Sequence, residues 1–185
     1  MVFAHDTEVS LATAAALVGT APGTAPGRRE ERLPDAAALD AFVDEWDYTG
    51  SRTHDEAELD AVRALRPELR RLWTAEEDEQ VAGVNALLGR ARALPQLVRH
   101  DGWDWHLHAT TPQAPLAERM AVEAAMALVD VLRVGERSRL RTCAADDCDA
   151  VLVDLSRNRS KRFCDGGCGA RVAAAAYRAR AASRA

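Results

Sequence analysis

Four cysteines are the residues of this sequence best suited to chemistry, and all of them lie between positions 143 and 168. They form two close pairs, Cys143 with Cys148 and Cys164 with Cys168, separated by fifteen residues. Each pair can offer two thiolates from one tight turn, and four thiolates are a donor set that zinc takes in structural, tetrahedral sites. Four sulfurs leave no open coordination position, and no His or Glu lies between the pairs to act as a base. The spacing therefore predicts one structural Zn²⁺ and not a catalytic one.

Two disulfides, or four unrelated buried thiols, are the alternative interpretation of these cysteines. Disulfide scaffolds belong to secreted chains whose cysteines are spread along the sequence. Here the first 142 residues contain no cysteine. The paired spacing and this distribution both favour the metal.

The residues around the cysteines predict a small treble-clef-like module. Residues 150–155 are typical of a short strand, 156–160 of a turn and 161–163 of a return strand. After Cys168 the sequence becomes rich in Ala and Arg, which is typical of a helix, so the last cysteine would lie in its first turn. A helix N-terminus carries partial positive charge and favours a thiolate there. We therefore expect a hairpin followed by a helix around the ion.

Charge is distributed unevenly along the 185 residues, whose net charge is −5. Positions 133–185 hold twelve Arg or Lys and six Asp or Glu, a net charge of +6. Positions 1–132 hold twelve and twenty-three, a net charge of −11. Such asymmetry indicates an anionic partner for the basic end. Ordinary solvated surface is the alternative explanation.

Basic residues flank the predicted metal site in two groups, one at the hairpin tip and one on the last helix. A rigid zinc module would hold both groups in a fixed relation, as contacts to phosphates require. Arg pairs bidentately with phosphate or with guanine. The residues predicted to contact double-stranded DNA are Arg157, Asn158, Arg159, Lys161, Arg162, Arg171, Arg178 and Arg180.

An acidic protein surface is the other candidate partner for the basic end. In that case the module would be a zinc-stabilised protein–protein interaction module. The acidic residues 1–132 could also bind the basic end within the same chain and mask it. These alternatives stay open beside DNA binding.

Residues 1–134 are predicted to form a helical domain with one β-hairpin, so the fold class is mainly α. Apolar residues recur at helical spacing in segments 35–46, 53–72 and 74–92. We expect the second and third of these helices to begin with capping boxes at Thr53 and Thr74. Residues 135–185 would form the zinc module, packed closely against the helical domain.

Two further features organise the helical domain. Pro67 should kink or break the helix that contains it. The apolar stretch 115–134, ended by Gly135, predicts a helix that is central to a bundle or to a homodimer interface. A dimer is therefore one candidate assembly.

The β-hairpin is predicted between residues 96 and 108, around an Asp-Gly turn. Alternation would place Trp103, Trp105 and Leu107 on one face and His106 and His108 on the other. The two histidines could be metal ligands, but no third ligand stands close in the sequence. We therefore predict that they are solvated on an exposed strand face.

Several classes of protein do not fit this sequence. It contains no run of about 18 apolar residues, so we expect no membrane span. The residues before Leu11 include acidic side chains and no Lys or Arg, unlike the start of a signal peptide, and we expect residues 11–18 to form a small core helix of a cytoplasmic protein. No Gly-rich phosphate loop and no nucleophile with a placed base is evident, so we predict no enzymatic activity.

The segment from Ser156 to Cys164, followed by Cys168-Gly-Ala-Arg171, resembles the CGNR zinc fingers. In that family a ligand- or stress-related helical domain called ABATE precedes the finger, and the segments of this chain occur in the same order. Members are described as transcription regulators, so the resemblance implies DNA binding. It also implies a helical sensory or dimerising domain, with a small-molecule effector as a further candidate partner.

The chain departs from the family pattern at several positions. Ala170 stands where the signature has Asn, and Phe163 where a Trp is usual. The second cysteine pair is one residue shorter, and two glycines would absorb the tighter turn. Gly19 replaces an Asn near the N-terminus, so an effector pocket that used this polar group would be altered.

Overall fold

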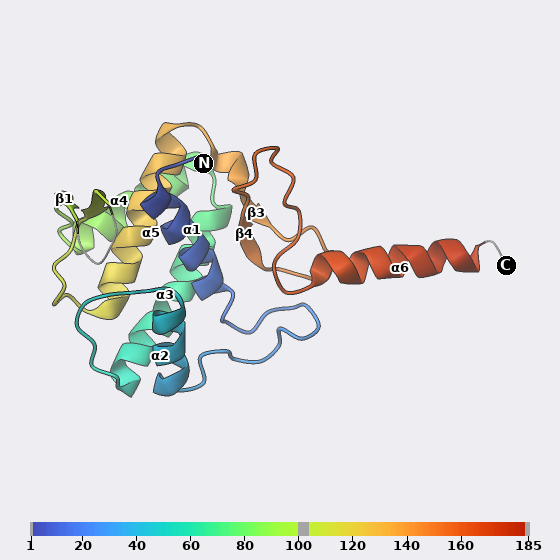
Figure 1. Ribbon diagram of the computed structural model, residues 1–185, viewed down its shortest axis with the longest axis horizontal. Helices are drawn as coiled ribbons and strands as arrows, with labels where there is room; N and C mark the ends of the chain where they lie inside the picture. The colour runs from blue at the N-terminus through green and yellow to red at the C-terminus, as the bar shows by residue number, and fades with distance from the viewer. Residues whose placement is uncertain (1, 100–103, 184–185) are drawn as a thin grey trace.

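The computed structural model describes residues 2–99 and 104–183, and its architecture is mainly α, as predicted. Helices α1 to α5 form the body of the molecule, and the last helix, α6, projects away from it (Figure 1). The elements are α1 (His5–Val18), α2 (Ala36–Glu45), α3 (Glu56–Thr74), α4 (Glu77–Arg90), β1 (Gln96–Val98), β2 (His106–His108), α5 (Leu116–Arg133), the 3₁₀ turn η1 (Arg137–Arg139), β3 (Leu140–Thr142), β4 (Val151–Val153) and α6 (Cys168–Ala182).

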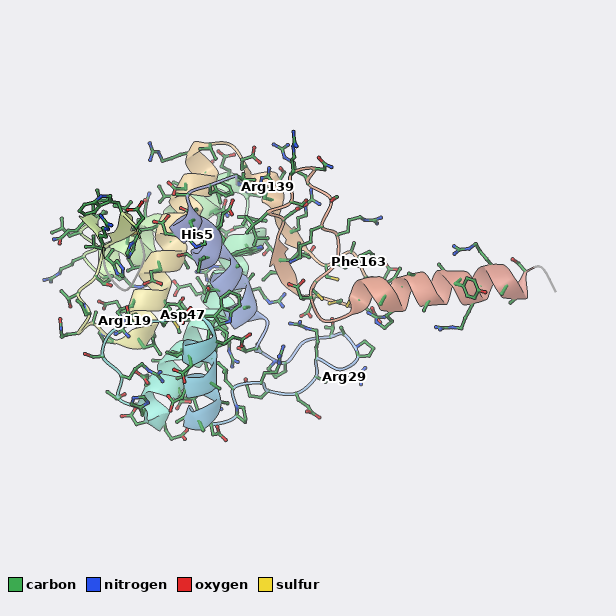
Figure 2. The ribbon with its side chains drawn as sticks, in the orientation of Figure 1. His5, Arg29, Asp47, Arg119, Arg139 and Phe163 are labelled. Carbon is green, nitrogen blue, oxygen red and sulfur yellow. The ribbon has the colours of Figure 1, made fainter. Side chains whose placement is uncertain are left out.

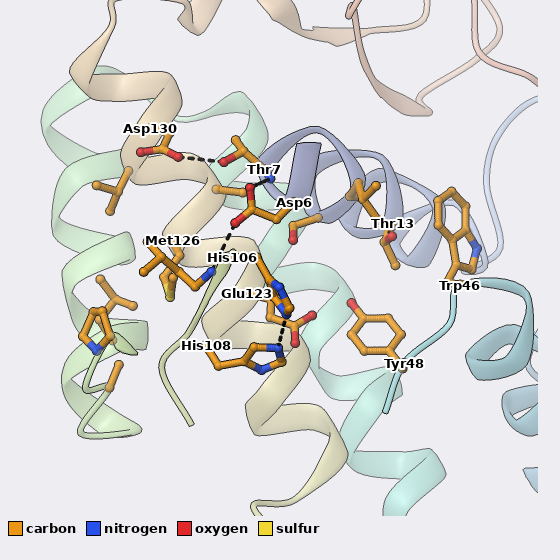
Figure 3. A pocket seen from close by; sticks show the side chains of 18 of the residues that line it. Asp6, Thr7, Thr13, Trp46, Tyr48, His106, His108, Glu123, Met126 and Asp130 are labelled. Carbon is orange, nitrogen blue, oxygen red and sulfur yellow. Dashed lines mark hydrogen bonds between the residues drawn. The ribbon is translucent and has the colours of Figure 1, made fainter. Parts of the chain in front are cut away.

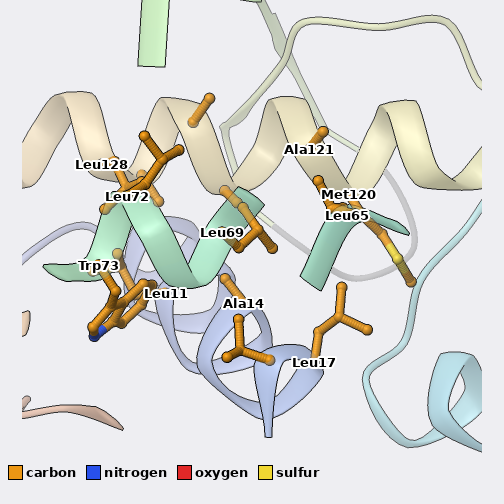
Figure 4. Packing of buried hydrophobic residues seen from close by; sticks show 14 of the residues in the cluster. Leu11, Ala14, Leu17, Leu65, Leu69, Leu72, Trp73, Met120, Ala121 and Leu128 are labelled. Carbon is orange, nitrogen blue, oxygen red and sulfur yellow. The ribbon is translucent and has the colours of Figure 1, made fainter. Parts of the chain in front are cut away.

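Helix α5 lies at the centre of the body and contacts α1, α3 and α4. Figure 4 shows Leu72 of α3 beside Leu128 of α5 and Leu11 of α1 beside Trp73 of α3, and all four side chains are buried. Truncating a leucine buried in this way costs about 2–5 kcal/mol of stability. Helix α5 is followed by Gly135, whose φ of 69° is a left-handed conformation that glycine adopts readily. No helix in the described ranges is long and apolar enough to cross a membrane.

The helix starts differ in detail from the predicted capping boxes. The cap of α3 is Asp55, whose carboxylate accepts the backbone N–H of Glu58 at 2.9 Å. Thr53 instead donates its hydroxyl to that carboxylate, so the predicted Thr53 cap is wrong by two residues. Thr74 ends α3 and does not cap α4, whose first flanking residue makes no side-chain cap. Helix α3 continues through the exposed Pro67, so of the predicted kink or break the helix is not broken there.

The short hairpin presents its faces in the opposite sense to the prediction. Strands β1 and β2 pair antiparallel with Leu97 opposite Leu107. His106 is 9% exposed, whereas Leu107 is 44% and Trp105 61% exposed. The prediction of solvated histidines is therefore wrong, because the polar face of β2 turns inward. The predicted Asp-Gly turn and Trp103 lie outside the described residues.

The predicted return strand at residues 161–163 is not formed. Strand β4 pairs instead with β3, which precedes the first cysteine, with Leu140 opposite Val153. Residues 154–163 form a loop that returns to the first cysteine pair through one backbone bond, from Ala144 N to the Arg162 carbonyl. The module thus consists of the β3–β4 pair, this loop and α6.

The module packs against the helical part of the chain. Val151 and Val153 of β4 belong to the main hydrophobic core, and β4 contacts α1. The indole Nε1 of Trp73 donates to the Leu152 carbonyl at 2.9 Å. Ala25, from the loop after α1, is buried among the cysteines. These contacts hold the two parts in one orientation.

Candidate metal centre and nucleic-acid interface

The four cysteines converge at the base of α6. Their sulfur atoms lie within 4.8 Å of one another, all four side chains are buried, and none is in a disulfide. The Sγ atoms of Cys148 and Cys164 are 3.8 Å apart, and those of Cys164 and Cys168 are 3.6 Å apart. A tetrahedron with Zn–S bonds of about 2.3 Å places its sulfurs about 3.8 Å apart. The donor set and its spacing therefore fit one zinc ion.

The turn between the last two cysteines explains the shortened pair. Gly167 precedes α6 with a φ of 80°, a left-handed conformation that a residue with a Cβ adopts only at a cost. This is the tighter turn that the two glycines were expected to absorb. It sets Cys168 as the first residue of α6, where the partial positive charge of the helix N-terminus favours a thiolate.

The thiols need a positive charge nearby to ionise. Burial, together with the three neighbouring thiols, raises the pKa of Cys148 to about 12. Burial alone would also raise the pKa of Cys168, but hydrogen bonds from Arg171 and the other thiols outweigh it and lower that pKa. A divalent cation supplies the remaining charge that four thiolates require.

Arg171 is a basic residue in direct contact with the metal centre. Its Nη2 donates to the Sγ of Cys168 at 3.4 Å, and its two Nη atoms donate to the carboxylate of Asp147, each at 2.6 Å. A bidentate guanidinium–carboxylate pair is among the stronger hydrogen-bonded pairs in proteins. Arg171 thus joins the N-terminus of α6 to the turn of the first cysteine pair.

The loop after β4 is held by two buried charged residues that the sequence analysis did not single out. Asp154 is 0% exposed and accepts the backbone N–H groups of Ser156 and Lys161, both at 3.0 Å. Arg139 is 5% exposed and donates to the carbonyls of Asp154 and Ser156 (Figure 2). These hydrogen bonds tie both ends of the loop that carries the basic tip.

The predicted DNA-contacting residues fall into two sets. Three of them are paired with acids of the same module: Arg159 with Glu136 at 2.7 Å, Lys161 with Asp165 at 3.0 Å, and Arg171 with Asp147. None of these acids belongs to residues 1–132. These three ion pairs are therefore not contacts by which the acidic helical part, residues 1–132, would mask the basic end.

The second set consists of exposed side chains without an ion pair among the described residues. Arg162 lies over the ring of Phe163, 5.6 Å from its centroid, and that ring packs against the cysteine cluster. Ala170, at the position of the signature Asn, is exposed. The members of this second set are Arg157, Asn158, Arg162, Arg178 and Arg180.

Helix α6 has the least tertiary contact of the described helices. Its fifteen residues span about 22 Å, and every described residue after Arg171 is exposed. Figure 1 shows the helix leaving the module end-on, and Figure 2 shows how few long side chains it carries. Tyr177 and Val172 are large apolar side chains left exposed on it. An isolated helix of this length is marginal in water, so its surface is available to a partner.

The comparisons agree with this architecture. Residues 11–135 match the ABATE family, which is described as "Putative stress-induced transcription regulator", and residues 139–181 match the CGNR zinc finger. Neither description is that of an enzyme family. Among curated proteins no sequence matches the chain. The buried cluster of Cys143, Cys148, Cys164 and Cys168 lies within the matched finger and identifies its cofactor as one structural zinc ion. The chain therefore belongs to the ABATE family and carries a C-terminal CGNR zinc finger.

Proposed function

We propose that this protein is a transcription regulator that binds double-stranded DNA through its zinc module. The observation that carries the proposal is the exposure of α6 on all sides beyond Arg171. A regulator needs a surface that meets nucleic acid, and this projecting helix with its free arginines has the form and charge for it.

The composition of α6 suits the major groove of DNA. The groove is about 12 Å wide and admits an α-helix. Most residues of α6 between Val172 and Ala182 are alanines, so the helix is thin along its length. Arg178 and Arg180 are two residues apart and therefore point about 200° apart around the helix axis. A helix lying in the groove would direct them toward phosphates on opposite walls.

The loop after β4 adds a second group of contacts near the base of α6. Arg157 and Arg162 are exposed there, and the loop is fixed from beneath by Asp154 and Arg139. A pre-formed loop loses little conformational entropy when it meets a phosphate. Phosphate contacts from these side chains would position the module, and α6 would add little base-specific readout because alanines carry no hydrogen-bonding groups.

The role proposed for Cys143, Cys148, Cys164 and Cys168 is to hold zinc where the loop and α6 meet. Without the ion, the first cysteine pair and the start of α6 would be joined by the Arg171–Asp147 ion pair and by four buried thiols that no cation holds together. Loss of zinc would therefore loosen the fixed relation between the two groups of basic residues and weaken DNA binding.

Salt dependence of binding to duplex DNA tests the proposal. Contacts from the four free arginines 157, 162, 178 and 180 predict that log Kd changes with log salt with a slope of about 3 to 4. Replacing both Arg178 and Arg180 with Ala should reduce this slope by about 2 and weaken binding on all sequences alike. Arg90→Ala is the matched control, because Arg90 is exposed on α4 and pairs with Glu68 away from the module.

Two results would contradict the proposal. One is the absence of binding by the zinc-loaded chain at low salt. The other is binding that the Arg178/Arg180 double variant and Arg90→Ala weaken equally. Binding of an acidic protein surface in place of DNA, with the same dependence on Arg178 and Arg180, would support the protein-interaction alternative instead.

A further inference from the structure

A cavity of about 460 Å³ opens in the helical part of the chain, away from the zinc module. Its walls come from α1, from α5 between Glu123 and Arg133, from strand β2 and from the segment that follows α2 (Figure 3). Pockets that bind small molecules have volumes of about 300–1,000 Å³. Gly19, where the family pattern has Asn, is not among the lining residues of this cavity.

Carboxylates dominate the charged groups around the cavity. Four of them face one arginine, Arg133, and the two histidines of β2. Apolar and aromatic side chains, among them Trp46, Tyr48 and Met126, complete the wall. The carboxylates are those of Asp6, Asp47, Glu123 and Asp130.

Two of these carboxylates already have partners within the protein. Asp130 accepts the hydroxyl of Thr7 at 2.7 Å. Asp6 accepts the backbone N–H of Thr7 at 2.9 Å with one oxygen and that of Leu107 at 3.4 Å with the other. They brace α1 against α5 and β2 and contribute negative potential to the cavity.

Glu123 differs from them because it accepts no hydrogen bond from the residues that the structure describes. It is held in a desolvated position on α5, and Figure 3 shows it beside His106, His108 and Tyr48. This desolvation raises the pKa of Glu123 to about 7, against the opposing charge of Arg119. Glu123 is half-buried and lines the cavity, so its partly desolvated carboxylate can meet a ligand there.

The two histidines are bonded to each other. Their Nε2 atoms are 2.9 Å apart, and the Nδ1 of His106 lies 2.7 Å from the carbonyl oxygen of Asp104. A carbonyl oxygen can only accept, so the Nδ1 of His106 donates to it. The contact between the two Nε2 atoms requires one proton between them, so the two rings are hydrogen-bonded to each other.

We propose that this cavity binds a small organic cation, an amine with an aromatic or aliphatic body. Its ammonium group would donate to Glu123, in the negative potential of Asp6 and Asp130. Its apolar body would lie against Trp46, Tyr48 and Met126, where aromatic rings also attract a cation. Because α1 lines the cavity and also packs against β4, the occupant would touch the helix on which the zinc module is seated.

Calorimetric titration of the zinc-loaded full chain with 2-phenylethylammonium tests the proposal. The expected result is saturable binding of one molecule per chain, at least about tenfold tighter than 3-phenylpropionate or the uncharged 3-phenylpropanol. Glu123→Gln should weaken binding of the cation by about tenfold or more. Glu118→Gln, on the same helix but lining the neighbouring cavity, is the control and should leave binding within about twofold.

Several results would overturn the proposal, provided that each variant unfolds at a temperature close to that of the wild type. One is binding of 3-phenylpropionate as tight as that of 2-phenylethylammonium. Another is an equal loss of affinity for the cation in Glu123→Gln and Glu118→Gln. The third is no saturable binding of the cation up to about 10 mM. Retention of a second zinc ion per chain, lost in His108→Ala, would identify a metal site and overturn it as well. The measurement needs no DNA, so its outcome is independent of the proposed regulatory function.

Discussion

The guanidinium of Arg171 donates two hydrogen bonds of 2.6 Å to the carboxylate of Asp147, and its Nη2 also reaches the Sγ of Cys168. Four thiolates around one zinc ion carry a net charge of about −2, so a guanidinium beside one sulfur offsets part of it. A role for Arg171 in DNA binding stays a prediction. Its position gives it a role at the metal centre.

Replacing Arg171 with Ala should make the zinc ion easier to remove. Partners of metal ligands typically change metal affinity by about 10–100-fold, so we expect zinc transfer to a chromogenic chelator to accelerate by at least about tenfold. Arg178→Ala removes the same charge from an exposed position on the same helix and should leave the transfer rate unchanged. Equal rates of zinc transfer in the Arg171→Ala and Arg178→Ala variants would contradict a role for Arg171 at the metal centre.

The metal centre itself predicts a stoichiometry and a loss of structure. Metal analysis of the purified chain should find about one zinc per chain, and Cys148→Ser should reduce that value. Since Val151 and Val153 belong to the main core, loss of zinc should also lower the melting temperature of the whole chain. A metal-free chain that melts at the same temperature as the zinc-loaded chain would contradict this coupling.

Asp154→Asn should destabilise the protein by about 2–4 kcal/mol, because it removes the charge opposite Arg141 and one of the loop's acceptors. Urea denaturation measures the change. Asp165→Asn removes an exposed carboxylate, paired with the side chain of Lys161, and should fall within about 0.5 kcal/mol of the wild type. Equal changes in the free energy of unfolding for Asp154→Asn and Asp165→Asn would contradict the role of Asp154 in holding the loop.

The same carboxylate predicts a dependence on acid. Burial would raise the pKa of Asp154, but its hydrogen bonds with Ser156 and Lys161 and the charge of Arg141 lower it below the usual 3.8. The stability that Asp154 contributes is therefore present above that ordinary value and is lost as the pH falls through the lowered one. Asp154→Asn should remove this part of the acid sensitivity.

Glu123 predicts the opposite dependence, at higher pH. Its pKa rises from 4.5 in the ordinary state to about 7 in the fold, so the folded state retains a proton that the unfolded state has released. Stability should therefore decrease as the pH rises from about 4.5 to 7, by up to about 2–3 kcal/mol. Glu123→Gln should match the wild type near pH 5 and exceed it near pH 8 in urea denaturation. Parallel profiles for the two proteins would contradict the assignment.

The zinc centre was predictable from the sequence because metal ligands act over short separations. Two cysteines five apart and two cysteines four apart specify a pair of turns, and the ion joins them. The helices were predictable for a similar reason, since apolar spacing reports the buried face. The cap of α3 is Asp55 and not Thr53, because both side chains can accept the first N–H groups of the helix. The sequence alone does not show which of the two does so.

The cavity and the loop supports were not predictable in the same way. Alternation showed that His106 and His108 share a face but not that this face would meet Glu123, which lies on a different helix. Asp154 and Arg139 hold the loop through hydrogen bonds to its backbone, and every residue type has the same backbone groups. The sequence therefore does not show these partners. A faint signal was present, since an Asp directly after the apolar Val-Leu-Val of β4 is poorly placed unless it has donors around it.

The contact of Ala25 with the cysteine cluster has a practical consequence for engineering. The finger takes part of its apolar lining from residues more than a hundred positions upstream, and Thr24 hydrogen-bonds Asp149 beside it. A fragment cut out at residue 135 would expose that lining to water. Chimaeras that graft this finger onto another regulator should therefore carry the segment 20–28 with it, or supply a substitute for it.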